Sequence, residues 1–581
     1  MNGPVVKYKI SDYTILFTLA VAAVLSYLFK WNYSEHLINF IDGDARDYYS
    51  SLISAFIKHD FSNQQATEWF ILRTGSGTIN VHPIGVSVLL LPFFALGYLF
   101  AGLFHFPVDG LSLPFQITVA AGALAYAGIG LIFLKKLFRL NGIADKISAL
   151  ILLLTFFGTN LLYYTLSEAA MSHVYSFSLI AVFLYHSNRY VLLLQNKNLY
   201  AASAILGLIL LVRPNNVFII LSLFIWFKNR EECRNFLNIL FKKKAVYLAV
   251  SITATIVLLQ SVVWYIQTGS LFHNTYKADG FYWFNPQILK MLFGFDSGFF
   301  IYTPLCFLFL GGIIFIYREN RFAFLSATAL LLILFYFFSS YWAYTYFDGI
   351  GIRVLVDYYP LFAFFGAKFF TATVKSKWII APFMAALFFV FVNLVYCYQV
   401  ERNILYKTGM TYAKWKYIFL RTAPEYQMSL GGCYDFKPFS RTHPEASLSG
   451  EVKFEQPFDF SGKDFGVLVA FDSVKFSSNR VHIKIDVSRQ ELQMHASDDA
   501  MVCGMLDDGI SRSHKSYFQF KLNDVPATQC CDKKEYHYTA NMVADFKPND
   551  KLSVYLWNIK TQPFLIDKFS VKVYNYNYQI L

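Results

Sequence analysis

Charged residues are scarce in this chain. Asp, Glu, Lys and Arg make up only 15% of its 581 residues, whereas soluble globular proteins carry roughly 25%. Hydrophobic residues make up 56% and aromatic residues 19%, so there is too little polar surface to cover a water-soluble body. The composition excludes a disordered chain, a collagen and a small disulfide scaffold. It predicts a polytopic α-helical membrane protein.

Motifs for several kinds of site are also missing from the sequence. There is no P-loop, no glycine-rich dinucleotide fingerprint and no metal motif of Cys/His spacing. No nucleic-acid-binding motif accompanies the net charge of +12, so we expect no nucleic-acid partner. The sequence identifies no cofactor with certainty, and the need for a divalent cation stays an open question.

The excess positive charge lies in short clusters between apolar stretches. The clusters are Lys135/Lys136/Arg139, Lys228/Arg230/Arg234, Lys242/Lys243/Lys244, Arg318/Arg321 and Lys375/Lys377. Such clusters mark cytoplasmic loops. The first apolar run, Tyr13 to Phe29, follows Lys7 and Lys9 and lacks an A-x-A-like cleavage site. We therefore expect a retained signal anchor with a cytoplasmic N-terminus.

Apolar runs long enough to cross about 30 Å of hydrocarbon recur up to about residue 398. The expected spans, about eleven in number, are 11–29, 113–134, 146–165, 172–188, 199–213, 216–227, 245–266, 299–316, 321–340, 355–371 and 378–398. The run 84–104 is also long enough, but counting it as a span would put two basic clusters outside. We therefore expect it to lie in the external interface or to re-enter it. Residues 213–216 predict a tight external hairpin between two short spans.

Beyond about residue 420 the chain becomes polar and alternates apolar with polar residues, as over 481–487. Alternation bounded by Asn, Asp, Gly and Ser indicates antiparallel strands. We expect a transmembrane domain over 1–410 and an extracytoplasmic β-sandwich of jelly-roll type over 420–581. Four cysteines lie there: Cys433, Cys503, Cys530 and Cys531. An oxidising compartment would permit disulfides, but the adjacent pair leaves their connectivity open.

Carboxylates gather at the start of the first external loop, about residues 31–83. Asp42, Asp44 and Asp47 stand there, just outside the first span. A carboxylate at the hydrocarbon edge is partly desolvated, which raises its basicity, so it can take a proton from an alcohol or amine. The alternative is that these residues serve interfacial solvation or pair with Arg46.

The pattern Asp44-x-x-x-Tyr48 after the first span, with His82-Pro83 opening an apolar helix, resembles the GT-C superfamily of polyprenyl-phosphate-sugar glycosyltransferases. The nearest parallels are the protein O-mannosyltransferases and the bacterial aminoarabinose transferases of lipid A. The resemblance covers about residues 10–400. It implies that Asp44 is the catalytic acidic residue, that His82 is the cation meeting the donor phosphate, and that an interfacial helix follows.

Two departures from the family pattern keep alternatives open. Ala45 follows Asp44 where the family has an Asp-Glu pair, and Ile84 replaces the second proline of the motif. Asp42 or Asp47 therefore stays an alternative base.

The second external loop carries a further carboxylate. Glu168 occupies the place where the related families have a second acidic residue. It would orient the acceptor, share a metal with the first carboxylate or tune the pKa of that carboxylate. His173, close behind it, is either an acceptor-site residue or a plain helix-start residue.

A polyprenyl phosphate or pyrophosphate gathers negative charge as it leaves, and cations in a low-dielectric site stabilise that charge. Arginine suits phosphate because its planar fork matches the geometry of the anion. Arg353, which is preceded by glycines and followed by Asp357 and Pro360, resembles a Gly-x-Arg…Pro signature of bacterial GT-C members. Arg213 and Lys277 are further candidates in external loops. Snorkelling to lipid headgroups is the alternative for these cations.

Aromatic residues are dense in the external loops. Tyr48, Tyr49, Tyr344 and Tyr346 are candidates for contacts with the acceptor or the sugar. An interfacial aromatic belt is the alternative explanation.

These features predict a membrane glycosyltransferase with a GT-C-like helical domain, external interfacial helices and a C-terminal β-domain. It would move a sugar, with inversion, from a polyprenyl-phosphate-linked donor to a lipid, glycan or protein acceptor on the outer face of a bacterial inner membrane. Two alternatives remain, a flippase or transporter of lipid-linked oligosaccharide and a non-catalytic polysaccharide-binding scaffold.

Overall fold

The structure is a computed structural model of the whole chain. It describes residues 9–28, 40–61, 71–74, 77–275, 280–346, 349–374, 376, 379–427, 430, 447–454, 456–471, 480–493, 500–508, 514–522, 531, 533–543 and 550–575. The chain forms two compact units. The helical unit holds most residues up to Glu401, and the second unit runs from Arg402 and includes the short segments 277–282 and 341–343.

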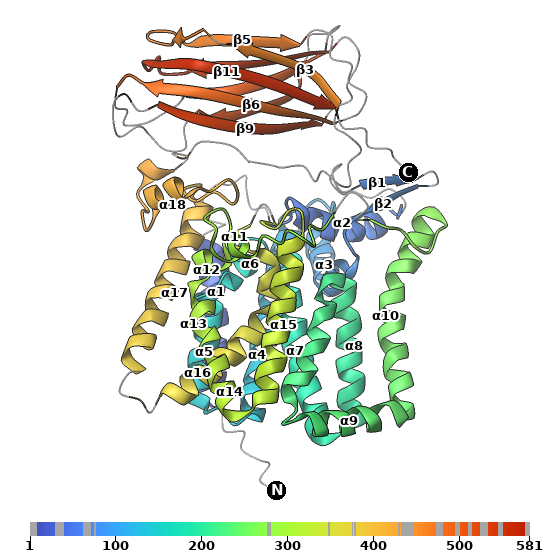
Figure 1. Cartoon of the computed structure of the whole chain (residues 1–581). Helices are drawn as coiled ribbons and strands as arrows, with labels where there is room; N and C mark the ends of the chain where they lie inside the picture. Colours follow the sequence, from blue (N-terminus) through green and yellow to red (C-terminus); the bar gives the residue numbers. More distant parts are fainter. Residues whose placement is uncertain are drawn as a thin grey trace. The chain divides into compact units, whose positions relative to one another are not determined.

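The helical unit is built from packed helices and one small hairpin (Figure 1). Its helices are α1 (Ile10–Ser26), α2 (Asp44–Phe56), α3 (Gly85–Leu103), α4 (Leu113–Leu140), α5 (Asp145–Phe157), α6 (Leu161–Leu166), α7 (Ser172–Leu193), α8 (Asn196–Val212), η3 (Pro214–Trp226), α9 (Arg230–Lys242), α10 (Lys244–Thr268), α11 (Ile288–Phe293), α12 (Phe299–Tyr302), α13 (Pro304–Leu310), α14 (Gly312–Glu319), α15 (Arg321–Ser340), η4 (Arg353–Tyr358), α16 (Tyr359–Thr373) and α17 (Ile380–Glu401). Strands β1 (Ile71–Thr74) and β2 (Gly77–Asn80) form the antiparallel hairpin.

Five helices among the described residues are long and apolar enough to cross a membrane, namely α3, α4, α10, α15 and α17. Helices α1, α8 and η3 are apolar but shorter. The expected span 146–165 is divided between α5 and α6, and the expected span 299–316 between α12, α13 and α14. Pro304 begins α13, where a missing amide hydrogen interrupts the helical hydrogen bonds. The number of spans stays a prediction.

The expected interfacial segment 84–104 is the helix α3, whose length and composition would also suffice for a span. Figure 1 places it near α2. Two contacts show that it packs antiparallel to the first half of α4. The hydroxyl of Tyr126 donates to the carbonyl of Leu89, and Gly97 lies against Phe115. A side chain at Gly97 would collide with the Phe115 ring, so glycine allows this close approach. The interfacial placement stays a prediction.

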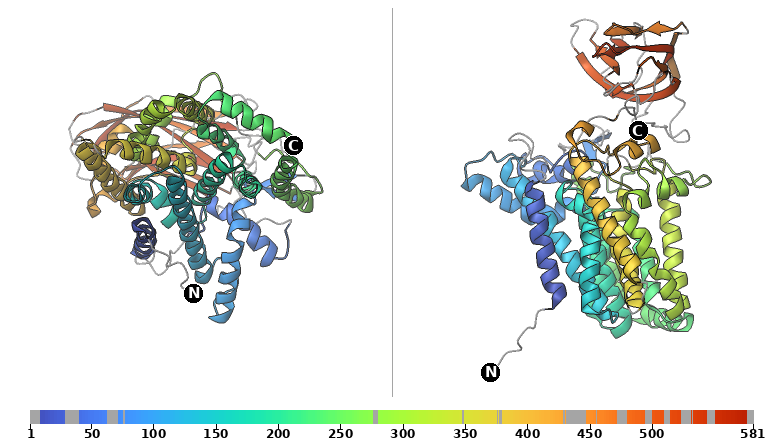
Figure 2. Two further views of the ribbon diagram at one scale, coloured as in Figure 1. Left: turned by 90° about the horizontal axis from the view of Figure 1, so that it is seen from below. Right: turned by 90° about the vertical axis from the view of Figure 1, so that its left-hand side faces the viewer.

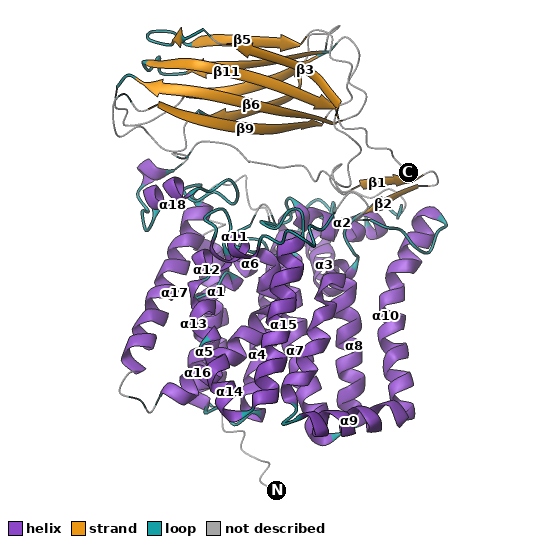
Figure 3. Ribbon diagram, viewed as in Figure 1, coloured by secondary structure: helices purple, strands orange, loops and turns teal. Residues whose placement is uncertain are grey.

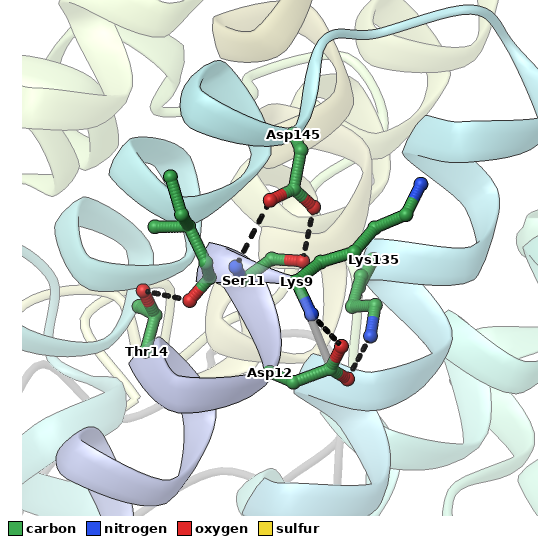
Figure 4. Close-up of polar contacts among 7 residues, drawn as sticks. Lys9, Ser11, Asp12, Thr14, Lys135 and Asp145 are labelled. Carbon is green, nitrogen blue, oxygen red and sulfur yellow. Dashed lines mark hydrogen bonds and ion pairs between the residues drawn. The ribbon is translucent and has the colours of Figure 1, made fainter. Parts of the chain in front are cut away.

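The basic clusters on α9 and around the junction of α14 and α15 lie at one end of the helical unit, and α2, α6 and α11 lie at the other (Figure 1). Helix α1 runs along the bundle beside the longer helices (Figure 2). Its start is tied to two neighbours: Lys135 of α4 pairs with Asp12, and the Ser11 hydroxyl donates to Asp145 of α5 at 2.5 Å (Figure 4). The basic end of α4 therefore lies beside the start of α1, as the charge pattern predicts.

The second unit contains α18 (Tyr412–Ile418), the turn η6 (Pro424–Tyr426) and two antiparallel sheets (Figure 3). One sheet has the order β5-β10-β7-β8, and the other has the order β3-β11-β6-β9 with β4 paired to β11. The strands are β3 (Ser447–Phe454), β4 (Phe458–Asp459), β5 (Phe465–Phe471), β6 (Arg480–Glu491), β7 (Ala500–Asp507), β8 (His514–Lys521), β9 (Lys533–Val543), β10 (Lys551–Asn558) and β11 (Phe564–Asn575). Apolar residues of both sheets share one core. The predicted two-sheet β architecture is thus confirmed.

The alternation predicted over 481–487 arises from the strand geometry of β6. Val481, Ile483, Ile485 and Val487 are buried in the shared core and Lys484 is exposed, although His482 on the polar side of the alternation is buried too. Among the cysteines of this unit, Cys503 is a buried free thiol and Cys531 is disulfide-bonded. Cys433 and Cys530 lie outside the described residues.

Candidate functional site

Asp44 and Arg353, separated by more than 300 residues in the sequence, form an ion pair. Nη1 of Arg353 lies 2.7 Å from Oδ2 of Asp44. Asp44 is the first residue of α2, and Arg353 is the first residue of η4. Their side chains keep 20% and 17% of their areas exposed. A carboxylate that can accept a proton and a guanidinium that can bind phosphate therefore meet at one partly accessible point.

The electrostatic surroundings of Asp44 favour its ionised form. Burial would raise the pKa of the Asp44 carboxyl, but the charge of Arg353 and its hydrogen bond to the carboxylate outweigh burial and lower the pKa below the ordinary value. The position at the start of α2 also suits an anion. Asp44 is thus an ionised carboxylate at neutral pH.

A second cluster surrounds Asp357, whose side chain is fully buried. Its Oδ1 lies 2.8 Å from Nδ1 of His173, and its Oδ2 accepts a hydrogen bond of 2.8 Å from the amide of Asn216. Nε of Arg213 lies 3.4 Å from the same Oδ2, and Nη1 of Arg213 donates to the hydroxyl of Ser172 at 3.1 Å. The buried carboxylate is stabilised by these partners, which come from α7, η3 and the end of α8.

The two clusters adjoin one another. Arg213 and Arg353 each act electrostatically on Tyr48, His82 and Tyr346, so both charges lie in the neighbourhood of the same side chains. The ring of His82 meets that of Tyr48 edge to face, with centroids 4.4 Å apart. Four of the predicted site residues, Asp44, His82, Arg213 and Arg353, are therefore brought together.

His82 differs from the cation that the family resemblance implies. Burial lowers the pKa of its ring to about 4, with Arg353 and Arg213 adding to the effect of burial and Asp44 opposing it. At neutral pH the ring is therefore uncharged. It can offer an N–H hydrogen bond to a phosphate, but not a full positive charge.

The two alternative carboxylates occupy different environments. The side chain of Asp42 is exposed and accepts a hydrogen bond from the backbone amide of Gly43. Asp47 is fully buried, and its carbonyl accepts a hydrogen bond of 2.6 Å from Asn80. Asp44 contacts Arg353 at 2.7 Å, which favours it as the base.

Four further predicted residues are described one by one. Glu168 accepts a hydrogen bond of 2.8 Å from the hydroxyl of Tyr163. Tyr49 is fully buried and packs against Phe94 of α3, so its ring belongs to an apolar interface. Tyr344 is half-buried in the segment after α15. Lys277 lies outside the described residues.

Within the part of the chain that the structure describes, no group of three or more His, Cys, Asp or Glu side chains is arranged to hold a metal ion.

Sequence reasoning did not single out Asp357 as a candidate site residue. It lies inside the expected span 355–371, and an ionisable residue within a span is itself a sign of a functional or paired site. That signal was present, but its partners His173 and Asn216 are 184 and 141 residues away. No local pattern connects residues so far apart in the chain.

No family model and no curated protein sequence matches the chain. Solved structures do match it. The oligosaccharyltransferase of Archaeoglobus fulgidus, in complex with zinc and sulfate, is 14% identical over 74% of this chain and 59% of its own length, with a TM-score of 0.40. The apo form of the same protein is 13% identical over 75% of this chain and 62% of its own length, with a TM-score of 0.37. The arabinosyltransferase EmbB of Mycobacterium smegmatis is 12% identical over 97% of this chain and 64% of its own, with a TM-score of 0.35. The chain thus spans about three fifths of the length of these proteins.

Proposed function

We propose that this chain is a GT-C-type membrane glycosyltransferase that uses a polyprenyl-phosphate-linked sugar. The observation that carries the proposal is the 2.7 Å contact between Arg353 and Asp44. Inverting transfer needs a base for the acceptor and a cation for the leaving phosphate, close to the same reacting carbon. The pair supplies both groups, and Arg213 supplies a second cation beside them.

The proposed step is a single displacement. The acceptor hydroxyl or amine gives its proton to the Asp44 carboxylate, and its oxygen or nitrogen forms a bond to the anomeric carbon. The bond from that carbon to the phosphate oxygen breaks, and the electron pair stays on the phosphate. One negative charge thereby moves from the carboxylate to the phosphate, where Arg353 and Arg213 stabilise it.

The other side chains have supporting roles in the proposal. His82 donates a neutral hydrogen bond to the donor phosphate. Tyr48 and Tyr346, which lie near both arginines, contact the sugar. Glu168 orients the acceptor from the neighbouring loop, and the β-unit binds acceptor glycan.

The proposed location is the outer face of a bacterial inner membrane. It is supported by the separation of the helical unit into a basic end with α9 and α14 and an opposite end with α2 and α6 (Figure 1). A donor carried by a polyprenyl chain would reach that end through the bilayer.

The test uses the full chain in lipid nanodiscs with a panel of isotopically labelled polyprenyl-monophosphate sugars and an acceptor fraction extracted from bacterial envelopes. We expect mass spectrometry to find the label in a new glycosidic bond, and Asp44→Asn to lower the transfer rate by about 10²-fold or more. Glu319→Gln removes a carboxylate that pairs with Lys368 at 2.6 Å and serves as the matched control.

Three outcomes contradict the proposal. Movement of labelled lipid across the bilayer without a new bond would indicate a flippase. Binding of polysaccharide without turnover would indicate a scaffold. Transfer by Asp44→Asn at the wild-type rate would remove Asp44 from the role of base.

A further inference from the structure

In the structure, one nitrogen of the Arg353 guanidinium is paired with Asp44. The distance of 2.7 Å between Nη1 and Oδ2 is that of a charge-assisted hydrogen bond. The corresponding contact between Arg213 and Asp357 is longer, at 3.4 Å. The stronger pair therefore contains the two groups to which the proposed reaction assigns the base and the phosphate cation. While they are paired, Arg353 makes Asp44 a weaker base, and Asp44 weakens the attraction of Arg353 for phosphate.

The groups around Asp44 show what controls its basicity. Arg353 approaches from η4, His82 from the segment before α3 and His173 from the start of α7. Burial alone raises the pKa of the Asp44 carboxyl, and Arg353 leads the influences that lower it. A carboxylate in this position becomes more basic when the guanidinium is withdrawn.

A phosphate that enters beside the pair competes with the carboxylate for the same guanidinium. Arg353 and Asp44 each keep about a fifth of their side-chain area exposed, so a phosphate can reach the pair without unfolding the helices around it. The planar fork of arginine binds phosphate and carboxylate with the same geometry. Arg213, whose Nε lies against Asp357, adds a second positive charge that attracts the phosphate.

We propose that the donor phosphate takes Arg353 from Asp44, so that one guanidinium is exchanged between the two anions and the carboxylate becomes an active base only when a donor is in place. This inference rests on the proposed function and adds the regulation of the same site. It couples abstraction of the acceptor proton to occupation of the phosphate position. An acceptor that arrives alone meets a carboxylate already neutralised by its partner.

The exchange predicts that one substitution at the site increases the affinity for phosphate instead of lowering it. Asp44→Asn removes the competitor for Arg353, so it should tighten phosphate binding while it lowers the transfer rate. A partly exposed carboxylate–guanidinium pair contributes on the order of 1 kcal/mol, which corresponds to a gain in affinity of about fivefold. Arg353→Gln should instead weaken binding about tenfold or more, because the cation itself is lost.

The experiment measures binding of a polyprenyl monophosphate, without sugar, to the full chain in nanodiscs at pH 7. We expect Asp44→Asn to bind about fivefold more tightly than wild type. In the Arg353→Gln background, Asp44→Asn should produce no such gain. Glu319→Gln controls for the loss of one carboxylate elsewhere on the chain and should change binding by less than about twofold. Asp44→Ser, which also removes the carboxylate, provides a second test should the asparagine variant not purify.

Two results overturn the exchange. One is binding by Asp44→Asn that equals or falls below wild type. The other is an equal gain with and without Arg353, which would indicate a general charge effect. A wild-type chain that does not bind the polyprenyl monophosphate contradicts the proposed function itself, so the two failures are distinguishable.

Discussion

Nδ1 of His173 lies 2.8 Å from Oδ1 of Asp357, and both side chains are fully buried. Because Asn216 and Arg213 meet the other oxygen, three side chains depend on one carboxylate. The contact also fixes the ring of His173 with Nδ1 toward Asp357. The arrangement holds the starts of α7 and η3 and the end of α8 around η4.

The Asp357 cluster predicts a graded loss of stability. Asp357→Leu removes the buried counterion of Arg213 and the carboxylate that His173 and Asn216 contact, which costs about 3–5 kcal/mol. Asp357→Asn should cost less, because a neutral His173 can move its proton to Nε2 and accept from the new amide at Nδ1. The measurement is the free energy of unfolding of the purified full chain in detergent. Equal losses for the two variants would contradict this account.

His82 predicts a pH dependence of fold stability. Its pKa is lowered by burial from 6.5 to about 4. The unfolded chain therefore takes up a proton near pH 6.5 that the folded chain accepts only near pH 4, so stability is lost as the pH falls through that window. We expect His82→Gln to reduce the change of the unfolding midpoint with pH between pH 6.5 and 4. His59→Asn is the control, since it removes an exposed histidine at a positive φ that asparagine tolerates. An unchanged slope for His82→Gln would count against the buried, neutral ring.

The two ends of the helical unit should face opposite compartments. Arg46 is exposed on α2, and Arg234 is exposed on α9. In right-side-out membrane vesicles, a membrane-impermeant maleimide should label Arg46→Cys directly and Arg234→Cys only after permeabilisation. The wild-type chain gives the background from native thiols. Labelling of both variants from one side would refute the predicted topology.

Much of the candidate site was predictable because its residue types are expensive to place at a membrane. Carboxylates and arginines next to apolar runs are rare, so Asp44, Arg213 and Arg353 stood out in the sequence, and two of them are in contact in the structure. Asp357 was not singled out as a site residue, because its importance depends on packing between distant helices. The neutral state of His82 depends on burial, which a motif does not encode.

The breaks in the expected spans were beyond sequence reasoning for a similar reason. The helix break at residues 158–160 leaves carbonyls that need donors. Asn393 of α17 supplies them, because its amide donates to the carbonyls of Phe157 and Thr159 at 2.8 and 2.9 Å. A hydropathy profile shows one long apolar run there. It cannot reveal the break, because the residue that stabilises it lies more than 230 residues away. The alternation in β6, by contrast, is a local pattern and was predicted correctly.

The most direct measurement is a cryo-EM structure of the full chain in nanodiscs with a bound polyprenyl monophosphate. The account predicts phosphate density in hydrogen-bond contact with the guanidinium of Arg353 and near Arg213, with Asp44 separated from its former partner. Phosphate bound instead at the basic end beside α9, with the pair of Arg353 and Asp44 unchanged, would contradict it.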